Sequence, residues 1–185
     1  MKINIFRIVK DHIGTLQSFR NKKISVIDIF IFYILPINIS TAVWYYCVKV
    51  PDDVYSISIS VFSIFSALLL SVQVAMYGVF RSERKLSGDR ILDESEKIRA
   101  EDVRKLLYEI NANISYLILI SCLSVVLFIL FFIVKWNPYI ESGMLAGIYS
   151  HFVLTLAMVL KRSHEVFSSE YNRPHRFDSR RNGGG

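Results

Sequence analysis

The chain has 185 residues, of which 52% are hydrophobic, and its 22 Lys and Arg residues against 16 Asp and Glu residues give a formal net charge of +6. A soluble domain of this length spreads its charges over its surface, whereas here long uncharged stretches alternate with strongly charged ones. This segregation excludes a soluble enzyme, a disulfide-stapled secreted domain and a disordered chain.

Four long uncharged stretches divide the chain. An apolar helix of about 18 residues or more is long enough to cross the hydrocarbon core of a bilayer. We therefore predict an all-α, polytopic membrane protein in which residues 24–160 form a bundle of four transmembrane helices. The predicted spans are residues 25–48, 54–80, 110–134 and 139–160.

The distribution of basic residues predicts the orientation of these spans. All Lys and Arg residues except Lys49 and Lys135 lie before the first span, between the second and third, or after the fourth. Connections rich in Lys and Arg stay on the cytoplasmic side of a membrane. We therefore expect both termini and the connection 81–109 in the cytoplasm.

Residues 1–23 carry the pattern of an amphipathic helix. Phe6, Val9, Ile13 and Leu16 recur at helical spacing among basic residues that can meet anionic headgroups. We expect a helix lying in the membrane interface, with Lys22 and Lys23 among its lipid or partner contacts. The alternative is a helix that packs on the cytoplasmic part of the protein itself, because the pattern does not identify the apolar partner.

Polar side chains at membrane depth are the default candidates for function. Span one offers Asp28 near its cytoplasmic end and Asn38 beside Pro36, which frees a backbone carbonyl and is expected to kink the helix. Span two offers Gln73, and span four offers His151 near its middle. His151 could carry a proton or gate a contact; the simpler alternative is a hydrogen bond to a serine or a backbone carbonyl.

Small side chains follow one face of span two, where they recur every three or four residues. Small faces let helix backbones approach closely, either within a bundle or between copies, so we predict a helix-packing or oligomer interface. The alternative is a serine-lined pore. Span four carries a second, shorter feature of this kind. The predicted contact residues are Ser56, Ser60, Ser63, Ala67, Ser71, Ala75 and Gly78 in span two, and Gly143 and Gly147 in span four.

The connection 81–109 is rich in charges of both signs. Val103, Leu106, Leu107 and Ile110 keep a helical rhythm into the third span. We expect the third helix to begin well before the membrane, as a charged stalk that a partner or a neighbouring subunit could grip.

The segment 161–185 is polar and basic. Arg173, Arg176, Arg180 and Arg181 form a cluster suited to anionic lipid, to nucleic acid or to an acidic partner, and composition does not choose among them. We interpret the three closing glycines, 183–185, as a linker remnant and leave them aside.

No catalytic signature is present in the sequence. It contains no phosphate-binding loop, no His-Glu-x-x-His, no Cys-x-x-Cys and no nucleophile elbow. We therefore expect no enzyme activity, no catalytic residue, no metal site and no cofactor.

The layout resembles the small four-span membrane subunits of bacterial antiphage defence operons, in particular the Kiwa membrane subunit. The features that carry the resemblance are the basic amphipathic segment 1–23, the short outer connections, the charged connection 81–109, the Gly143 and Gly147 pair and the basic tail. The resemblance implies a homotetramer in the bacterial inner membrane that recruits a cytoplasmic, DNA-binding partner subunit. It implies no direct contact of this chain with nucleic acid.

The leading hypothesis from the sequence is a non-enzymatic membrane sensor and scaffold that oligomerises and recruits a cytoplasmic protein encoded nearby. The expected partners are membrane lipid, further copies of the chain and that protein. The serine face of span two and His151 leave a pore-forming effector open. An immunity protein against a pore-forming bacteriocin is a third hypothesis.

Overall fold

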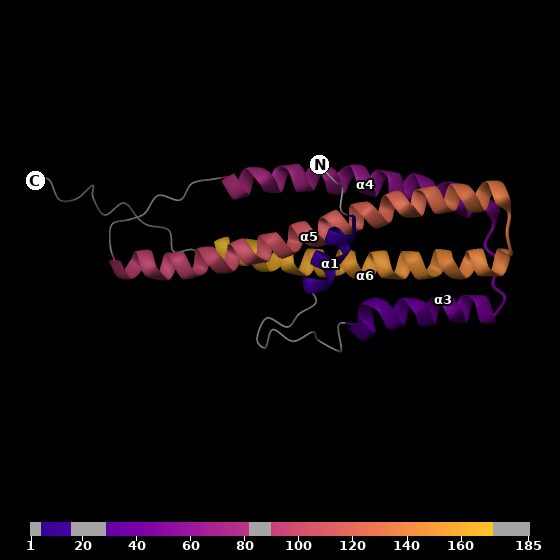
Figure 1. Cartoon of the computed structure of the whole chain (residues 1–185), viewed down its shortest axis with the longest axis horizontal. Coiled ribbons are helices and arrows are strands. Elements are labelled where there is room, and N and C mark those ends of the chain that lie inside the picture. The colour runs from indigo at the N-terminus through magenta and orange to yellow at the C-terminus, as the bar shows by residue number, and fades with distance from the viewer. Residues whose placement is uncertain (1–4, 16–28, 82–89, 172–185) are drawn as a thin grey trace, which may run out of the picture.

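The computed structural model describes residues 5–15, 29–81 and 90–171, and all regular elements within them are helices. Their order is α1 (Ile5–Thr15), the π-helical turn η1 (Phe30–Ile34), α3 (Leu35–Tyr45), α4 (Asp52–Arg81), α5 (Arg90–Val134) and α6 (Pro138–Tyr171). Helices α3, α4, α5 and α6 run alongside one another, and the α3–α4 and α5–α6 connections lie at the same end of the molecule (Figure 1). The all-α class predicted from the sequence is confirmed for the described residues.

Three helices are long and apolar enough to cross a membrane. Their qualifying segments are Asp52–Gly78 in α4, Glu101–Val134 in α5 and Pro138–Ser168 in α6. The first predicted span is described only from residue 29, where η1 and α3 form a shorter apolar helix, Phe30–Tyr45. The membrane-protein class therefore rests on three helices, and the fourth span remains a prediction.

The long helices extend beyond their apolar segments. Helix α5 has 45 residues, which is roughly 67 Å at 1.5 Å per residue, and it includes the charged stretch expected to form a stalk. Helix α6 continues to Tyr171, so residues 161–171, predicted as the start of the tail, belong to this helix.

An aromatic cluster joins α4, α5 and α6. Phe62 of α4 is fully buried, with its ring centroid 5.6 Å from that of Phe128 in α5. It lies 5.0 Å from the rings of both Tyr149 and Phe152 in α6. The tilted and edge-to-face arrangements of these rings are those that aromatic pairs prefer. This packing fixes the three long helices around one core.

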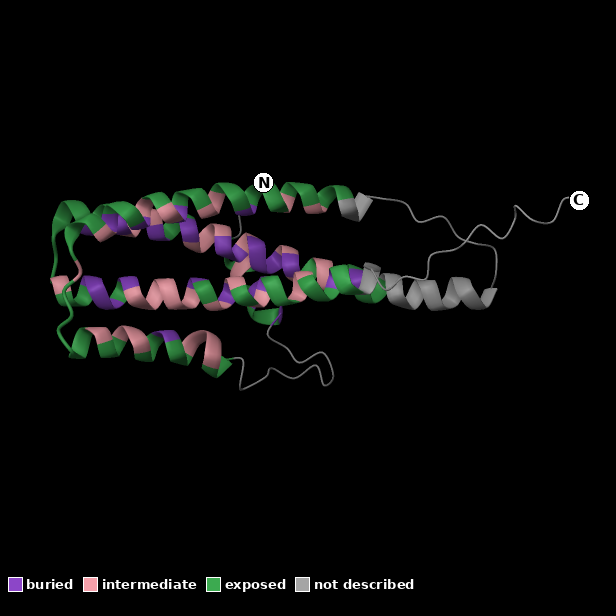
Figure 2. Cartoon of the chain, turned by 180° about the vertical axis from the view of Figure 1, so that it is seen from behind, coloured by how far each residue is buried: buried purple, intermediate pink, exposed green. Residues whose placement is uncertain are grey.

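The outward surface of the helices is also apolar. Along the outer side of α4, residues are exposed for most of its length (Figure 2). They include Ile57, Leu68 and Val74, which is 68% exposed. An exposed surface rich in large apolar side chains is what helices present to lipid or to another membrane helix.

Helix α3 packs against α6 through the predicted glycine pair. An added Cβ on Gly143 would lie 2.9 Å from the backbone oxygen of Ser40, and one on Gly147 would lie 3.0 Å from the Ser40 Cβ. The close approach of the two backbones therefore excludes a Cβ at Gly143, whereas a Cβ at Gly147 requires the Ser40 side chain to shift slightly. Gly78 of α4 differs, because an added Cβ there would meet nothing within 4 Å.

The difference between these glycines generates a stability prediction. Gly143→Ala should lower the free energy of unfolding by about 1–3 kcal/mol, because a Cβ against a backbone oxygen forces α3 away from α6. Unfolding in mixed micelles with increasing SDS measures this change. Gly78→Ala is the matched control, and it should leave stability unchanged or raise it by up to about 1 kcal/mol through helix propensity. Equal effects of the two substitutions would contradict the packing argument.

Candidate functional site

The imidazole of His151, in α6, is hydrogen-bonded at both nitrogens. Nδ1 lies 2.8 Å from the backbone oxygen of Phe32, and Nε2 lies 2.9 Å from the hydroxyl oxygen of Tyr116 in α5. A carbonyl oxygen can only accept, so Nδ1 carries the hydrogen and Nε2 accepts from the Tyr116 hydroxyl. The simpler of the two interpretations of His151, a hydrogen bond to a backbone carbonyl, is therefore the arrangement in the structure.

The Phe32 carbonyl is available because of Pro36. In an α-helix this carbonyl would accept from the N–H four residues later, and proline has none. The helix responds with the π turn η1, in which the Leu35 N–H bonds the Phe30 oxygen, five residues back. The carbonyl that the sequence predicted to be free is thus part of a contact between η1 and α6.

Helix α1 docks on α5 through its polar side. His12 is fully buried, and its Nδ1 lies 2.7 Å from Oδ1 of Asn113. The Thr15 hydroxyl lies 2.9 Å from the same Oδ1 and 2.7 Å from the His12 backbone oxygen. Because the Asn113 oxygen accepts, the hydrogen of the neutral His12 ring is on Nδ1. One buried amide oxygen therefore holds two side chains of α1.

A ring stack connects the two histidines. The His12 and Tyr116 rings are parallel, with an interplanar angle of 3° and centroids 3.8 Å apart. Tyr116 in turn donates its hydroxyl hydrogen to His151. The result is a continuous polar chain from α1 through α5 to α6 and η1.

An ion pair lies at one end of this polar chain. Arg162 of α6 lies 3.3 Å from Glu109 of α5, and both side chains are 15% exposed. Arg162 also donates to the backbone oxygen of Thr15 at 2.6 Å. This carbonyl belongs to the last residue of α1 as described, where a cation is favoured by the helix dipole.

The pKa of His12 is lowered from 6.5 to about 4. Burial is the main cause, because it penalises the charged ring; the hydrogen bond with Asn113 acts in the opposite direction, and the charges of His151 and Arg162 lower the pKa further. In addition, the buried Nε2 of His12 has no hydrogen-bond partner. A proton added there would create a buried donor without an acceptor, so α1 docks with neutral His12.

A second polar link joins α4 and α5. The Gln73 Nε2 donates to Asn111 Oδ1 at 3.2 Å and to Ser115 Oγ at 2.8 Å. Gln73 is thus used in packing within the chain, whereas Asn38 of α3 is exposed.

The small face predicted for span two points away from the core. All seven of its residues are exposed, on the side of α4 opposite Tyr55, Phe62 and Leu69. Ser60 and Ser71 bond the backbone oxygens one turn before them. Their hydroxyls are therefore satisfied within the helix, and the face can meet another helix without leaving these groups unpaired. The seven residues are Ser56, Ser60, Ser63, Ala67, Ser71, Ala75 and Gly78.

Several predicted site residues lie outside the described part of the chain. They are Asp28, Lys22, Lys23, Arg173, Arg176, Arg180 and Arg181. Among the described residues, no group of three or more His, Cys, Asp or Glu side chains is placed to hold a metal ion.

Sequence reasoning missed His12, Asn113 and Tyr116. The interpretation of the first segment followed its apolar face, but Phe6 is 86% exposed and His12 is fully buried. The available signal was the spacing of Ile8, His12 and Thr15, which places a second set of residues on one side of the helix.

Comparisons with known proteins add no relative: no family model, curated protein or solved structure matches the chain. The class of protein that the structure defines is an all-α protein with three membrane-spanning candidates.

The unpaired nitrogen of His12 generates a prediction of pH dependence. The undocked state takes up a proton near pH 6.5 and the docked state near pH 4. The free energy of α1 docking is therefore most favourable above pH 6.5. It becomes weaker by roughly 3 kcal/mol as the pH falls to about 4. A spin label on Gly14→Cys, with Cys47 and Cys122 replaced by serine, should become more mobile on acidification; an added Cβ at Gly14 would meet nothing within 4 Å.

The control is His12→Asn in the same labelled background. Asparagine cannot be protonated, so label mobility should no longer change over this pH range. An unchanged pH response in this variant would mean that another group controls the docking of α1.

Proposed function

We propose that this protein is a non-enzymatic sensor and scaffold subunit of a bacterial antiphage defence complex in the inner membrane. In this proposal, four spans place both termini in the cytoplasm, and copies of the chain assemble in the membrane and recruit a cytoplasmic partner. The resemblance to Kiwa-type membrane subunits supplies the biological setting and the expected copy number of four.

The observation that carries the scaffold proposal is the exposed small face of α4. The residues from Ser56 to Gly78 on this face are exposed, although α4 packs closely on α5 through its other side. Small residues at membrane depth are favoured where backbones of neighbouring helices approach. Another copy of the chain is the partner that such a face fits best, because the hydroxyls of Ser60 and Ser71 are already bonded. The same bonds favour a helix contact over a water-lined pore.

The polar chain supports the sensor part of the proposal. It joins η1 at membrane depth to α1 and to the Glu109–Arg162 ion pair near the base of the charged stalk. A movement of span one against α6 would break or shift the His151 bonds and so disturb the docking of α1. The stalk and α1 are then the parts through which a cytoplasmic partner would receive the signal.

The assembly is tested by native mass spectrometry of the detergent-solubilised protein. We expect a homotetramer, and we expect Ala67→Phe to reduce it to smaller species, because a large ring separates the α4 backbones. Val72→Phe is the matched control, since Val72 is 48% exposed but lies on another side of α4. A wild-type protein that is monomeric, or equal assembly of both variants, contradicts the scaffold proposal.

Recruitment is tested separately, by co-expression with the product of the adjacent gene. The wild type should co-purify with that protein, and a stalk variant with reversed charges at the exposed positions Glu101 and Arg104 should lose it while keeping its copy number. A potential-sensitive dye during expression serves as the second measurement. Depolarisation of the membrane without recruitment of the partner would contradict the scaffold proposal and favour a pore-forming effector.

A further inference from the structure

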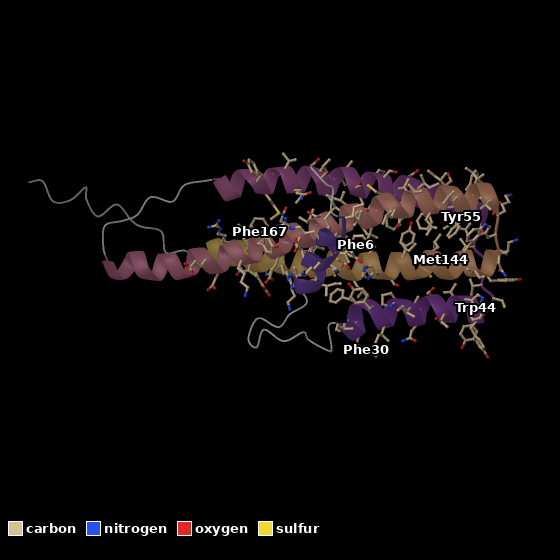
Figure 3. All side chains as sticks on the ribbon, in the orientation of Figure 1. Phe6, Phe30, Trp44, Tyr55, Met144 and Phe167 are labelled. Atoms are coloured by element: carbon tan, nitrogen blue, oxygen red, sulfur yellow. The ribbon has the colours of Figure 1, made fainter. Side chains whose placement is uncertain are left out.

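A groove of about 480 Å³ lies between α3 and α5, with α6 as its floor. Both helices pack against α6, but among the described residues their backbones do not approach each other. The walls include Ile37 of α3 and Leu123 of α5, which are both exposed, so the groove opens on the outer surface of the helices. Met144 lines it in the half of α6 toward the short connections (Figure 3). The groove therefore lies within the apolar segments of α5 and α6.

One buried polar side chain of this groove lacks a partner. Ser124 of α5 is 3% exposed and lines the groove, yet within the described residues its hydroxyl makes no hydrogen bond. Ser121, one turn away, instead bonds the Leu117 backbone oxygen at 2.8 Å. The Ser124 Oγ keeps access to the groove, unlike the fully enclosed Nε2 of His12. Because an unbonded hydroxyl is costly where no water is present, the groove offers a hydrogen bond to a neighbouring helix.

The small face of α4 carries a matching hydroxyl. Ser63, in the middle of this face, is exposed and makes no hydrogen bond in the part of the chain that the structure describes. It lies eleven residues from Asp52, and Ser124 lies ten residues from Val134, where α4 and α5 meet the short connections. At 1.5 Å per residue, these positions are roughly 16 Å and 15 Å from the same end of the molecule. Copies inserted in one orientation therefore bring the two hydroxyls to the same depth.

Shape favours the same pairing. The small face of α4 carries no bulky side chain on either side of Ser63, where its neighbours are Ser60 and Ala67. Such a face lets the helix backbone approach a groove closely. Helices α4 and α3 lie at opposite edges of the molecule, with α5 and α6 between them (Figures 1 and 2). The face and the groove of one chain therefore do not meet each other, and each needs a second copy.

We propose that the small face of α4 in one copy packs into the α3–α5 groove of the next copy, with a hydrogen bond between Ser63 and Ser124. Each copy offers one face and one groove, so the contact is head to tail, and only a closed ring leaves no face or groove uncovered. The inference rests on the assembly given under the proposed function and adds the second surface of the contact. A homotetramer is then a ring of four such contacts.

A symmetric contact between two α4 faces is the competing arrangement. It would leave the groove and the Ser124 hydroxyl to lipid, whose acyl chains offer no hydrogen-bonding group. It would also end at two copies, because a symmetric contact uses the same surface of both partners. The head-to-tail contact supplies a partner for Ser124 and allows four copies.

Disulfide cross-linking in native membranes tests the contact. In a background with Cys47 and Cys122 replaced by serine, a chain with Ser63→Cys is co-expressed with a larger-tagged chain with Ser124→Cys. Mild oxidation should link these two chains into a covalent dimer, and a chain with both substitutions should form linked species of up to four copies. Val126→Cys takes the place of Ser124→Cys in the matched control. Val126 is exposed on α5 but does not line the groove, so it should give no link to Ser63→Cys.

The hydrogen bond is tested by energy transfer between labelled copies in detergent. Ser124→Ala should weaken their association about threefold, which is the size of an average interhelical hydrogen bond in a membrane. Ser121→Ala is the matched control, because the Ser121 hydroxyl is already bonded within α5. Equal association constants for the two variants would contradict the hydrogen bond.

Three results would overturn the proposed contact. Covalent dimers of Ser63→Cys alone, in the yield of the mixed pair, would indicate the symmetric contact. A tetramer in native mass spectrometry that Ser63→Cys and Ser124→Cys do not link would exclude the groove as the contact without contradicting the assembly. A monomer would contradict both the contact and the assembly. Circular dichroism of each variant identifies a chain that fails to fold, and the alanine variants then decide the question.

Discussion

The position of η1 and α3 against α6 depends on the two hydrogen bonds of His151. An imidazole among apolar helices is costly unless both nitrogens find partners. Tyr116 supplies one partner and the Phe32 carbonyl supplies the other. The second bond requires Pro36 to leave that carbonyl free, and it requires glycines on α6 to bring the backbones close enough. Pro36 and, far from it in the sequence, the glycine pair and His151 of α6 therefore act together to fix η1 and α3 to α6.

His12 and His151 use the same chemistry with different results. Both donate from Nδ1 to an oxygen, but only His151 has a partner at Nε2. The contact of His151 is complete, so it suits a permanent joint between helices. The contact of His12 holds only while the ring is neutral, so the attachment of α1 is conditional. The stack of His12 on Tyr116 places the conditional contact directly against the permanent one.

Much of the helical frame could be predicted from composition, because runs such as residues 54–80 and 110–134 have few alternatives to an apolar helix. The close contact at Gly143 and the free carbonyl before Pro36 could also be predicted from the sequence, since both follow from backbone chemistry. The contact partners of the buried polar side chains could not be predicted in this way. His12 meets Asn113 across 101 positions of sequence, and Glu141 is buried by packing that no local pattern encodes. Periodicity identifies the face of a helix that is apolar, but it does not identify what that face, or the opposite one, will contact.

The order of synthesis gives the contacts of α1 and α3 a further consequence. Domains form from the N-terminal side as the chain leaves the ribosome, yet Ser40 has to wait for Gly143 and His12 for Asn113. The short apolar helix Phe30–Tyr45 thus enters its environment long before α6 exists to hold it. Until translation reaches α5, helix α1 lacks its contacts with Asn113, and until it reaches α6, helix α3 lacks its contact with Gly143. The fold is therefore completed only after the last helix has been synthesised, when the earliest helices can pack against it.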